Sequence, residues 1–458
     1  MKYNNEVSIT LKCTKSISRK CLISLILLLC LFFVPVSTFA ETTILMAQST
    51  ESIAAKTISE SVKIPSISSL NLKLKSAVLL EPITGQVLLS KNADKAYAPA
   101  SMTKLMTGYI IEDKVKNREI SWNDVVTVKE NASKTIGSRV FLAKGETHTV
   151  KELFFAMLIH SANDAAVALA EYVSGSEKQF VTLMNQEAQR MGMVNSYFIN
   201  SSGLDRADMP ITFRSEEKGE NMMSAMDVAN LVKYIIQDHP DFLETTTIQS
   251  YKFRASDREA LVNTNWMLES NKNVTQFKQF AYEGLDGLKT GFTDSAGYCF
   301  ASTAERNGMR LISVVMGTES TVERFTETKK VLDFGFNYFE VRQVVASNST
   351  AKGVDKVPVK KGTKTEVPVV TEQAINFIVP KGTDASQLSF KTSIMVDELT
   401  APFHEGTKTG TITYTYQIEG MANTQEKTVN LVSSQEMEKA GWFRLMLRSL
   451  WEGFHNIF

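Results

Sequence analysis

Cysteine is scarce in this sequence, and its positions form no pattern. Of the four cysteines in 458 residues, three lie within the first 40 residues, at Cys13, Cys21 and Cys30. Only Cys299 remains after that, so the rest of the chain has no internal disulfide framework. An apolar dipeptide follows Cys299, and this setting favours a small buried side chain over a reactive nucleophile.

Histidine and an excess of charge are also missing. The five histidines are scattered along the chain, without the spacing of metal ligands. Lysine and arginine number 50, and so do aspartate and glutamate. The first 40 residues carry five of the basic residues and one of the acidic ones, so 45 and 49 remain, a net charge of −4. This balance gives no indication of nucleic-acid binding.

Long apolar runs are limited to one segment near the N-terminus, residues 21–36. Four basic residues precede it, at Lys12, Lys15, Arg19 and Lys20. A motif resembling a cleavage site follows it, Thr38-Phe39-Ala40. This order predicts a secretory signal peptide at 1–40 and therefore an exported protein. An uncleaved N-terminal anchor is the alternative, although the apolar run is short for a membrane span.

The rest of the chain divides into four parts by its pattern. Residues 41–70 lack firm periodicity, and we interpret them as a flexible lead-in. Residues 71–340 have strand patterns at both ends and helical patterns between them. This predicts an α+β domain, with one antiparallel sheet built from both ends and a helical cluster inserted. Residues 341–435 alternate short β-branched runs with turns, which predicts a small all-β domain, and 436–458 predict an amphipathic helix.

Local patterns predict the elements of the α+β domain. Two strand-like runs at 77–80 and 86–89 enclose turn residues and predict a hairpin. Thr149 and Glu152 form a capping box at the start of a helix. Further strands are expected at 125–128, 139–142, 298–304 and 311–316, and further helices at 165–173, 179–191, 224–237 and 322–339. The polar segment 206–223 is expected to be a mobile loop.

A serine and a lysine stand three residues apart in the segment 98–109. Pro99 disfavours helix before them, and apolar residues recur at helical spacing from Met102 onward. Ser101 is therefore expected to open a helix, with Lys104 one turn along on the same face. A neutral lysine there can be the base for a nucleophilic serine, if burial or a second cation lowers its pKa. An N-cap serine beside a solvated lysine is the alternative.

Two further motifs follow this Ser-x-x-Lys pair. They are Ser161-Ala162-Asn163 and Lys289-Thr290-Gly291. Each motif is common by chance, and the chain repeats them at 121–123, 215–218, 349–352 and 408–410. Context separates the two sets, because Ser101 heads an apolar helix, Ser161 follows a capped helix, and Lys289 lies where a strand is expected.

As an ordered set, these motifs resemble those of the penicilloyl-serine transferase superfamily. The flanking residues 287–298 narrow the resemblance to the D-alanyl-D-alanine carboxypeptidases, the low-molecular-mass penicillin-binding proteins. The small all-β domain and the terminal helix are similar to that family as well. The resemblance covers residues 76–458 and implies a β-lactamase/transpeptidase-like fold. It also implies a serine-type enzyme that removes the terminal D-Ala from peptidoglycan stem pentapeptides and is acylated by β-lactam antibiotics.

The resemblance assigns the catalytic steps to three side chains. Ser101 would attack the penultimate carbonyl, Lys104 would be the base, and Ser161 would pass a proton to the leaving amine. The backbone N–H groups of Ser101 and Phe292 would form the oxyanion hole. No metal and no organic cofactor is implied.

The resemblance also assigns residues to substrate binding. Asn163 would hold the substrate backbone, and Lys289 and Thr290 would face its terminal carboxylate. Gly291 would let the substrate approach along the sheet edge. Arg324 matches the position of a family arginine near the carboxylate, and an ordinary surface arginine is the alternative.

Other activities stay open. A β-lactamase is less favoured for two reasons. The acidic residue that activates its water has no identifiable counterpart here, and residues 161–163 read Ser-Ala-Asn where class A β-lactamases favour Ser-Asp-Asn. A β-lactam sensor or cell-wall scaffold that does not turn over, and a transpeptidase with an amine acceptor, would keep the same nucleophile.

The last 23 residues, 436–458, have large apolar side chains along one side of the predicted helix. They are Trp442, Phe443, Met446, Leu447, Leu450, Trp451, Phe454, Ile457 and Phe458. The helix is too polar to span a bilayer, so we expect it to lie in the interface at the outer face of the cytoplasmic membrane. Packing on the all-β domain is the alternative.

Overall fold

The structure is a computed structural model and describes residues 62–455, except 215–218, 352, 384–387, 389 and 422. The predicted signal peptide, most of the predicted lead-in and the Ser215 repeat of the Ser-x-x-Lys motif lie outside the described residues. Residues 67–70 of the predicted lead-in form a 3₁₀ helix, Ile67–Leu70.

A five-stranded antiparallel sheet is the centre of the first domain, and it confirms the predicted architecture. Its strand order is β2-β1-β11-β10-β9, so strands from both ends of the domain share one sheet. The bounds are β1 Ser76–Glu81, β2 Gln86–Lys91, β9 Leu285–Thr293, β10 Gly297–Arg306 and β11 Met309–Thr318. The Lys-Thr-Gly motif at 289–291 therefore lies on the edge strand β9.

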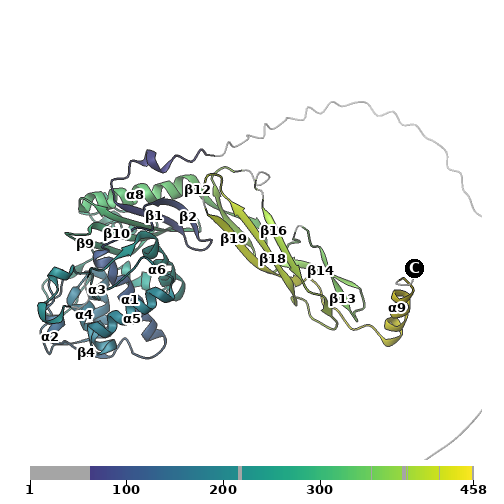
Figure 1. Ribbon diagram of the computed structural model, residues 1–458, viewed down its shortest axis with the longest axis horizontal. Coiled ribbons are helices and arrows are strands. Elements are labelled where there is room, and N and C mark those ends of the chain that lie inside the picture. The colour runs from purple at the N-terminus through teal and green to yellow at the C-terminus, as the bar shows by residue number, and fades with distance from the viewer. Residues whose placement is uncertain are drawn as a thin grey trace, which may run out of the picture. The chain divides into compact units, whose positions relative to one another are not determined.

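Helices cover both faces of this sheet, as Figure 1 shows. In β1, Val78 and Leu80 pack against the inserted helices, whereas Ala77 and Leu79 pack in the cluster that contains α8. This alternation follows from the two-residue period of a strand. The helices are α1 Lys104–Lys116, α2 Glu130–Lys134, α3 Val150–Ile159, α4 Asn163–Ser174, α5 Glu177–Arg190, α6 Ala225–Asp238, α7 Phe242–Thr246 and α8 Thr321–Tyr338.

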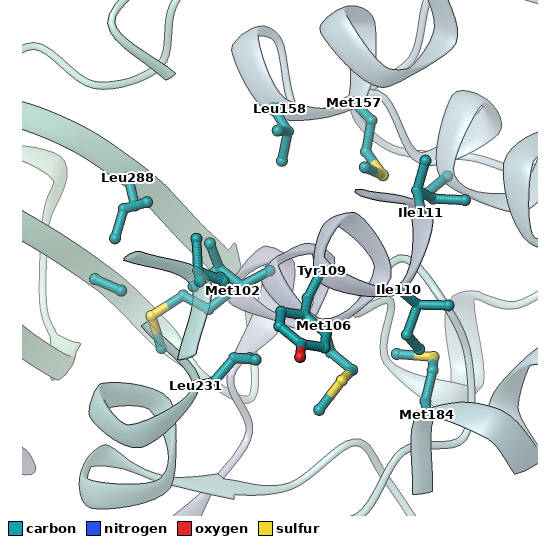
Figure 2. Packing of buried hydrophobic residues seen from close by; sticks show 14 of the residues in the cluster. Met102, Met106, Tyr109, Ile110, Ile111, Met157, Leu158, Met184, Leu231 and Leu288 are labelled. Atoms are coloured by element: carbon teal, nitrogen blue, oxygen red, sulfur yellow. The ribbon is translucent and has the colours of Figure 1, made fainter. Parts of the chain in front are cut away.

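Helix α1 lies in the middle of the inserted cluster. In Figure 2, Met106 and Ile110 of α1 are surrounded by side chains of other helices, among them Met157, Met184 and Leu231. All five side chains are at most 2% exposed. The helix that follows Ser101 is therefore held by packing on several sides, which gives the motif a rigid base.

Short elements connect these parts. Three two-stranded ribbons pair β3 Ala96–Tyr97 with β6 Met223–Ser224, β4 Val125–Thr127 with β5 Thr147–Thr149, and β7 Ser250–Tyr251 with β8 Leu261–Val262. The 3₁₀ helices here are Ala100–Thr103, Arg206–Asp208, Ile211–Phe213 and Glu269–Asn273.

The expected strand at 139–142 is wrong. The backbone N–H groups of Val140 and Leu142 donate to the buried carboxylate of Asp164 instead of to a strand, at 3.0–3.1 Å. Phe141 between them has φ of 56° and is 73% exposed. A side chain far along the sequence thus takes the hydrogen bonds that a strand partner would take, and local pattern does not reveal it.

The segment 206–223, predicted to be a mobile loop, has structure in its described part. It contains two 3₁₀ helices and ends at β6. Met209 and Asn221 are buried, at 5% and 3% exposed. These two side chains attach the segment to the domain, so it is not a simple surface loop.

The all-β part follows α8. Strand β12 Phe339–Val345 pairs with β15 Ile375–Pro380, and a second sheet has the order β16-β18-β19-β14-β13-β17. The bounds are β13 Lys356–Lys360, β14 Glu366–Thr371, β16 Lys391–Val396, β17 Leu399–Thr400, β18 Lys408–Gln417 and β19 Thr424–Ser433. Helix α9, Trp442–His455, ends the described chain. The predicted order of an α+β domain, a β domain and a terminal helix is confirmed.

Candidate active site

Ser101 and Lys104 are in direct contact. Ser101 lies in the 3₁₀ helix Ala100–Thr103, and α1 begins at Lys104, so the predicted single helix is two joined helices. In a 3₁₀ turn, residues three apart lie one above the other. The Lys104 Nζ atom is 2.9 Å from the Ser101 Oγ atom. Lys104 is 0% exposed, whereas Ser101 is half-buried, so the hydroxyl is reachable and the amine is not.

Two more oxygens surround the amine. Nζ of Lys104 lies 2.6 Å from the side-chain Oδ1 of Asn163 and 2.6 Å from the backbone carbonyl of Ser202. The Asn163 amide is oriented by its other end, because Nδ2 donates to the carbonyl of Ile136 at 2.8 Å. Asn163 therefore presents an acceptor to Lys104, and the Ser-x-Asn motif meets the Ser-x-x-Lys motif.

The surroundings favour an uncharged Lys104. Burial lowers the pKa of Lys104 well below its usual value, and the positive charge of Lys289 lowers it further. The carboxylate of Asp164 opposes this, raising the pKa of Lys104. The net effect is a lower pKa, so the amine can take a proton from a hydroxyl near neutral pH. The solvated-lysine alternative is wrong because Lys104 is fully buried. The role of Lys104 as the base stays a prediction.

Ser161 lies in the bend between α3 and α4. Its backbone is left-handed, with φ of 66°, and it is 6% exposed. The next residue but one is Asn163, whose N–H donates to the carbonyl of Ser138 at 2.7 Å. The bend therefore places Ser161 just before Asn163, whose side-chain amide contacts Lys104.

The third motif runs along β9. Lys289 is 1% exposed and its Nζ donates to the carbonyl of Thr290 at 3.0 Å. Burial, aided by the charge of Arg324, lowers the pKa of Lys289 to about 7. The Thr290 hydroxyl donates to the hydroxyl of Thr264 at 2.7 Å, a contact that the sequence did not predict.

Gly291 brings β9 close to the nucleophile. A Cβ atom at this position would lie 2.7 Å from the carbonyl oxygen of Pro99 and 3.2 Å from the backbone nitrogen of Ser101. Any larger residue would therefore separate the strand from Ser101. Glycine sets the width between the Lys-Thr-Gly strand and the Ser101 backbone.

Arg324 lies behind this strand. It is 6% exposed, and its Nη1 donates to the carbonyl of Gly291 at 3.2 Å. Burial lowers the pKa of Arg324 to about 10, and its guanidinium lies over the ring of Tyr298 at 5.6 Å. The alternative of an ordinary surface arginine is therefore wrong. The Phe292 ring packs against the Tyr298 ring at a tilt of 30°, with centroids 4.2 Å apart, and Phe292 is 48% exposed.

The sequence predicts a turn at residues 200–204 but gives no reason to connect this turn with Lys104. The Ser202 carbonyl makes this connection, and Gly203 lies so close to the first motif that a Cβ would be 1.9 Å from the carbonyl oxygen of Ala100. A backbone carbonyl has no sequence signature, so only the Asn-x-x-Gly turn pattern was available.

Within the described residues, His, Cys, Asp and Glu form no group of three that could hold a metal ion.

Comparisons with known proteins match nearly the whole chain. The family model for D-alanyl-D-alanine carboxypeptidase matches residues 40–320, and the model for the C-terminal domain of penicillin-binding protein 5 matches residues 339–439. D-alanyl-D-alanine carboxypeptidase DacF of Bacillus subtilis is 35% identical over 377 residues, which are 82% of this chain and 89% of DacF. DacC of Escherichia coli is 32% identical over 406 residues, 87% of this chain and 92% of DacC.

Solved structures agree with these matches. PBP3 of Streptococcus pneumoniae, described as a peptidoglycan synthesis regulatory factor, superimposes with a TM-score of 0.69 and 29% identity, over 80% of this chain and 100% of that one. Penicillin-binding protein 5 of Haemophilus influenzae gives a TM-score of 0.63 and 28% identity, over 82% of this chain and 100% of that one.

Proposed function

This chain belongs to the D-alanyl-D-alanine carboxypeptidase family, the low-molecular-mass penicillin-binding proteins, and from that premise we propose how its residues carry out the reaction. It is a serine-type carboxypeptidase that acts on the D-Ala-D-Ala end of peptidoglycan stem peptides. The observation that carries the assignment of residues is the 2.9 Å contact between the Lys104 Nζ and the Ser101 Oγ.

Acylation begins at Ser101. As its Oγ attacks the carbonyl carbon of the penultimate D-Ala, Lys104 takes the hydroxyl proton. The negative charge that develops on the carbonyl oxygen faces the backbone N–H groups of Ser101 and Phe292. Ser161 passes a proton to the nitrogen of the leaving D-Ala as the C–N bond breaks, and it takes a proton back from the Lys104 ammonium, which becomes neutral again. Water then attacks the ester on Ser101, releases the shortened peptide and restores the hydroxyl.

The terminal carboxylate selects the substrate. Charged Lys289 and the Thr290 hydroxyl bind it, while Arg324, through its hydrogen bond to the Gly291 carbonyl, adds positive charge behind the strand. Asn163 holds the peptide backbone. Gly291 leaves room for the substrate to lie beside β9.

The direct test measures D-Ala released from a stem pentapeptide by the mature protein and by Ser101→Ala. Wild type should release D-Ala and the variant should not. Ser121→Ala, in the other Ser-x-Asn tripeptide, is the matched control and should behave as wild type. Failure of wild type to release D-Ala, with Ser101 still labelled by a fluorescent penicillin, would instead favour a sensor or an amine-requiring transpeptidase. Rapid loss of that label by hydrolysis of the penicillin would favour a β-lactamase.

β-Lactam binding follows from the same chemistry. The strained amide of a penicillin places its carbonyl where the penultimate peptide carbonyl would lie, and its carboxylate where the terminal carboxylate would lie. Ser101 then forms an ester that hydrolyses slowly. The names of the relatives, penicillin-binding protein 5 among them, support this proposal.

Membrane association rests on α9. Its large apolar side chains are exposed: Trp442 76%, Phe443 57%, Met446 43%, Leu447 50% and Trp451 68%. Among the described helices, none is long and apolar enough to cross a bilayer. Exposed aromatic and aliphatic side chains on one terminal helix suit the boundary between headgroups and acyl chains. Together with the signal sequence expected at 1–40, this supports an exported protein held at the outer face of the cytoplasmic membrane.

A further inference from the structure

The Lys104 amine has three oxygen neighbours, and they are not equivalent. The Asn163 Oδ1 and the Ser202 carbonyl can only accept hydrogen bonds, whereas the Ser101 hydroxyl can also donate one. A neutral amine has two N–H groups and one lone pair. With both N–H groups directed at the two carbonyl oxygens, the lone pair is left for the Ser101 hydroxyl. The Ser202 carbonyl therefore decides where the lone pair of the base points.

The orientation of that carbonyl is set from the other side of its own peptide group. The Ser202–Gly203 peptide is trans, so its C=O and its N–H point in opposite directions. The carbonyl faces Lys104, and the N–H of Gly203 donates to the side-chain Oδ1 of Asn200 at 2.7 Å. Asn200 and Lys104 thus hold opposite ends of one rigid plane.

Asn200 is itself well fixed. It is 1% exposed, and its Oδ1 also accepts from the N–H of Ser202 at 3.2 Å and from Nδ2 of Asn221 at 3.0 Å. Its Nδ2 donates to the carbonyl of Leu204 at 2.8 Å. Both ends of the amide are in use, so its oxygen cannot turn away from Gly203 without loss of other bonds.

The rest of the turn is anchored without Asn200. Ser201 donates through its N–H and its hydroxyl to the Glu177 Oε1, at 3.0 and 2.7 Å, and its carbonyl accepts from the Thr107 hydroxyl at 2.7 Å. Gly203, with φ of 85°, lies against Ala100. Loss of the Asn200 side chain should therefore free the 202–203 peptide to rotate while the turn stays in place.

We propose that Asn200 is a positioning residue for acylation, which fixes the Ser202–Gly203 peptide plane so that Ser202 takes one N–H of Lys104 and the lone pair is left for Ser101. The proposal rests on the assignment of Lys104 as the base. It adds a residue outside the three motifs to the machinery of the reaction. Asn200 touches neither substrate nor the reacting atoms, and acts through Lys104.

The test uses the rate constant of acylation by a fluorescent penicillin as a function of pH, for the full mature protein. Asn200→Ala should lower the maximal acylation rate constant, the plateau of the pH profile, about 10- to 100-fold, because the lone pair of Lys104 no longer points at the Ser101 hydroxyl. It should also move the acid limb, the pH range in which the rate constant falls as Lys104 becomes protonated, to lower pH. The ammonium form of Lys104 loses a hydrogen-bond acceptor, which lowers its pKa. Lys289 of β9 and Asp164 of α4 are the charged groups that also act on Lys104, and both are unchanged in the variant.

Asn200→Asp is the second variant, and it should shift the acid limb in the opposite direction. A carboxylate keeps an oxygen for the Gly203 N–H, so the plateau should recover at least partly. Its negative charge stabilises the ammonium form of Lys104 and should move the acid limb to higher pH. Opposite shifts from two substitutions at one site are not expected from a general loss of stability.

Asn185→Ala is the matched control. Its side chain makes three bonds to backbone groups of the same region, to Val181 O at 3.1 Å and to Phe198 O and N, both at 2.9 Å. It should lose stability without a shift of the acid limb. Wild-type labelling and D-Ala release establish the proposed function separately. With those in place, an acid limb that moves in neither Asn200 variant, or an equal fall of the plateau in Asn185→Ala, would overturn the proposal.

Discussion

At the scale of single residues, the site depends on two buried lysines with different tasks. In the proposed mechanism, Lys104 must be neutral to take a proton, and Lys289 must be charged to attract a carboxylate. Burial disfavours the charged form of both, and each has another cation nearby. Because the pKa of Lys289 is lowered to about 7, the enzyme should change its affinity for substrate within the neutral pH range.

A pH profile of kcat/KM for D-Ala release tests this. Lys289 is charged below about pH 7 and neutral above it, so kcat/KM should fall as pH rises through that value. Lys289→Arg keeps the charge and should move this alkaline limb upward by more than one pH unit, even if the maximal rate is lower. Lys408→Arg, in the other Lys-Thr-Gly tripeptide, should leave the profile unchanged. An alkaline limb that stays in place in Lys289→Arg would show that Lys289 does not set it.

Removal of the Lys289 side chain should be costly below about pH 7, where the side chain is charged. In Lys289→Ala, the terminal carboxylate loses a charged hydrogen bond of about 2–3 kcal/mol, which corresponds to roughly 30- to 150-fold in kcat/KM on peptide. Lys408→Ala is again the control, since its side chain is exposed on β18. An unchanged kcat/KM in Lys289→Ala would refute the role in carboxylate recognition.

At the scale of elements, the site is the meeting of a strand, a 3₁₀ helix and two bends. Strand β9 approaches the 3₁₀ helix that carries Ser101 as closely as glycine allows. The start of α4, directly after the bend that holds Ser161, supplies Asn163, and the turn at 200–204 supplies the Ser202 carbonyl. None of these elements is catalytic alone, and their spacing decides whether the reacting groups meet.

Gly291→Ala tests the spacing. Its Cβ would lie 2.7 Å from the Pro99 carbonyl, so β9 must move away from Ser101. Acylation by penicillin should fall about 10- to 100-fold, with a loss of stability of about 1–3 kcal/mol from the overpacked contact. Gly441→Ala, where a Cβ meets no atom within 4 Å, should change neither quantity. Normal acylation by Gly291→Ala would mean that the strand can shift without effect on the nucleophile.

How much the sequence predicts also differs by element. The hairpin of β1 and β2, the capped helix after Thr149 and the helix after Ser224 follow local rules, and the structure confirms them. In α6, for instance, the Ser224 hydroxyl accepts from the N–H of Asp227 at 3.1 Å. The segment 139–142 looked like a strand because it contains a short run of consecutive apolar residues, but the carboxylate of Asp164 accepts the hydrogen bonds of its N–H groups.

The three motifs could be found from the sequence because their side chains carry the chemistry. Their order along the chain and the expected elements around them were enough to pair Ser101 with Lys104. The Ser202 carbonyl and the Thr264 hydroxyl could not be found in this way. Their contribution depends on which backbone and side-chain atoms the fold brings together, and a short pattern does not contain that information.

At the scale of the whole molecule, the proposed catalytic site and the proposed membrane anchor belong to different parts of the chain. The motifs all lie between residues 101 and 291, whereas the exposed apolar helix α9 begins at Trp442. The β domain stands between them in sequence. Activity on a soluble peptide should therefore not depend on α9.

Substitution of the exposed apolar residues of α9 tests this separation. A variant with Trp442, Phe443 and Trp451 all changed to Glu should no longer sediment with membranes. The helix then has less apolar area to bury in the bilayer, and its added negative charges are repelled by anionic lipids. Its release of D-Ala from soluble pentapeptide should equal that of wild type. Val194→Glu, at a residue 85% exposed in the first domain, is the control and should still sediment. Continued sedimentation of the α9 variant would contradict the anchor.

The central claim is that Ser101, with Lys104 as its base, carries the acyl group. It is tested most directly by locating that group with mass spectrometry of proteolytic fragments after brief reaction with benzylpenicillin. The account predicts an increase equal to the mass of the penicillin on the fragment containing Ser101, none in Ser101→Ala, and greatly slowed labelling in Lys104→Ala. Labelling of Ser161 or another serine, or release of D-Ala by Ser101→Ala, would contradict it.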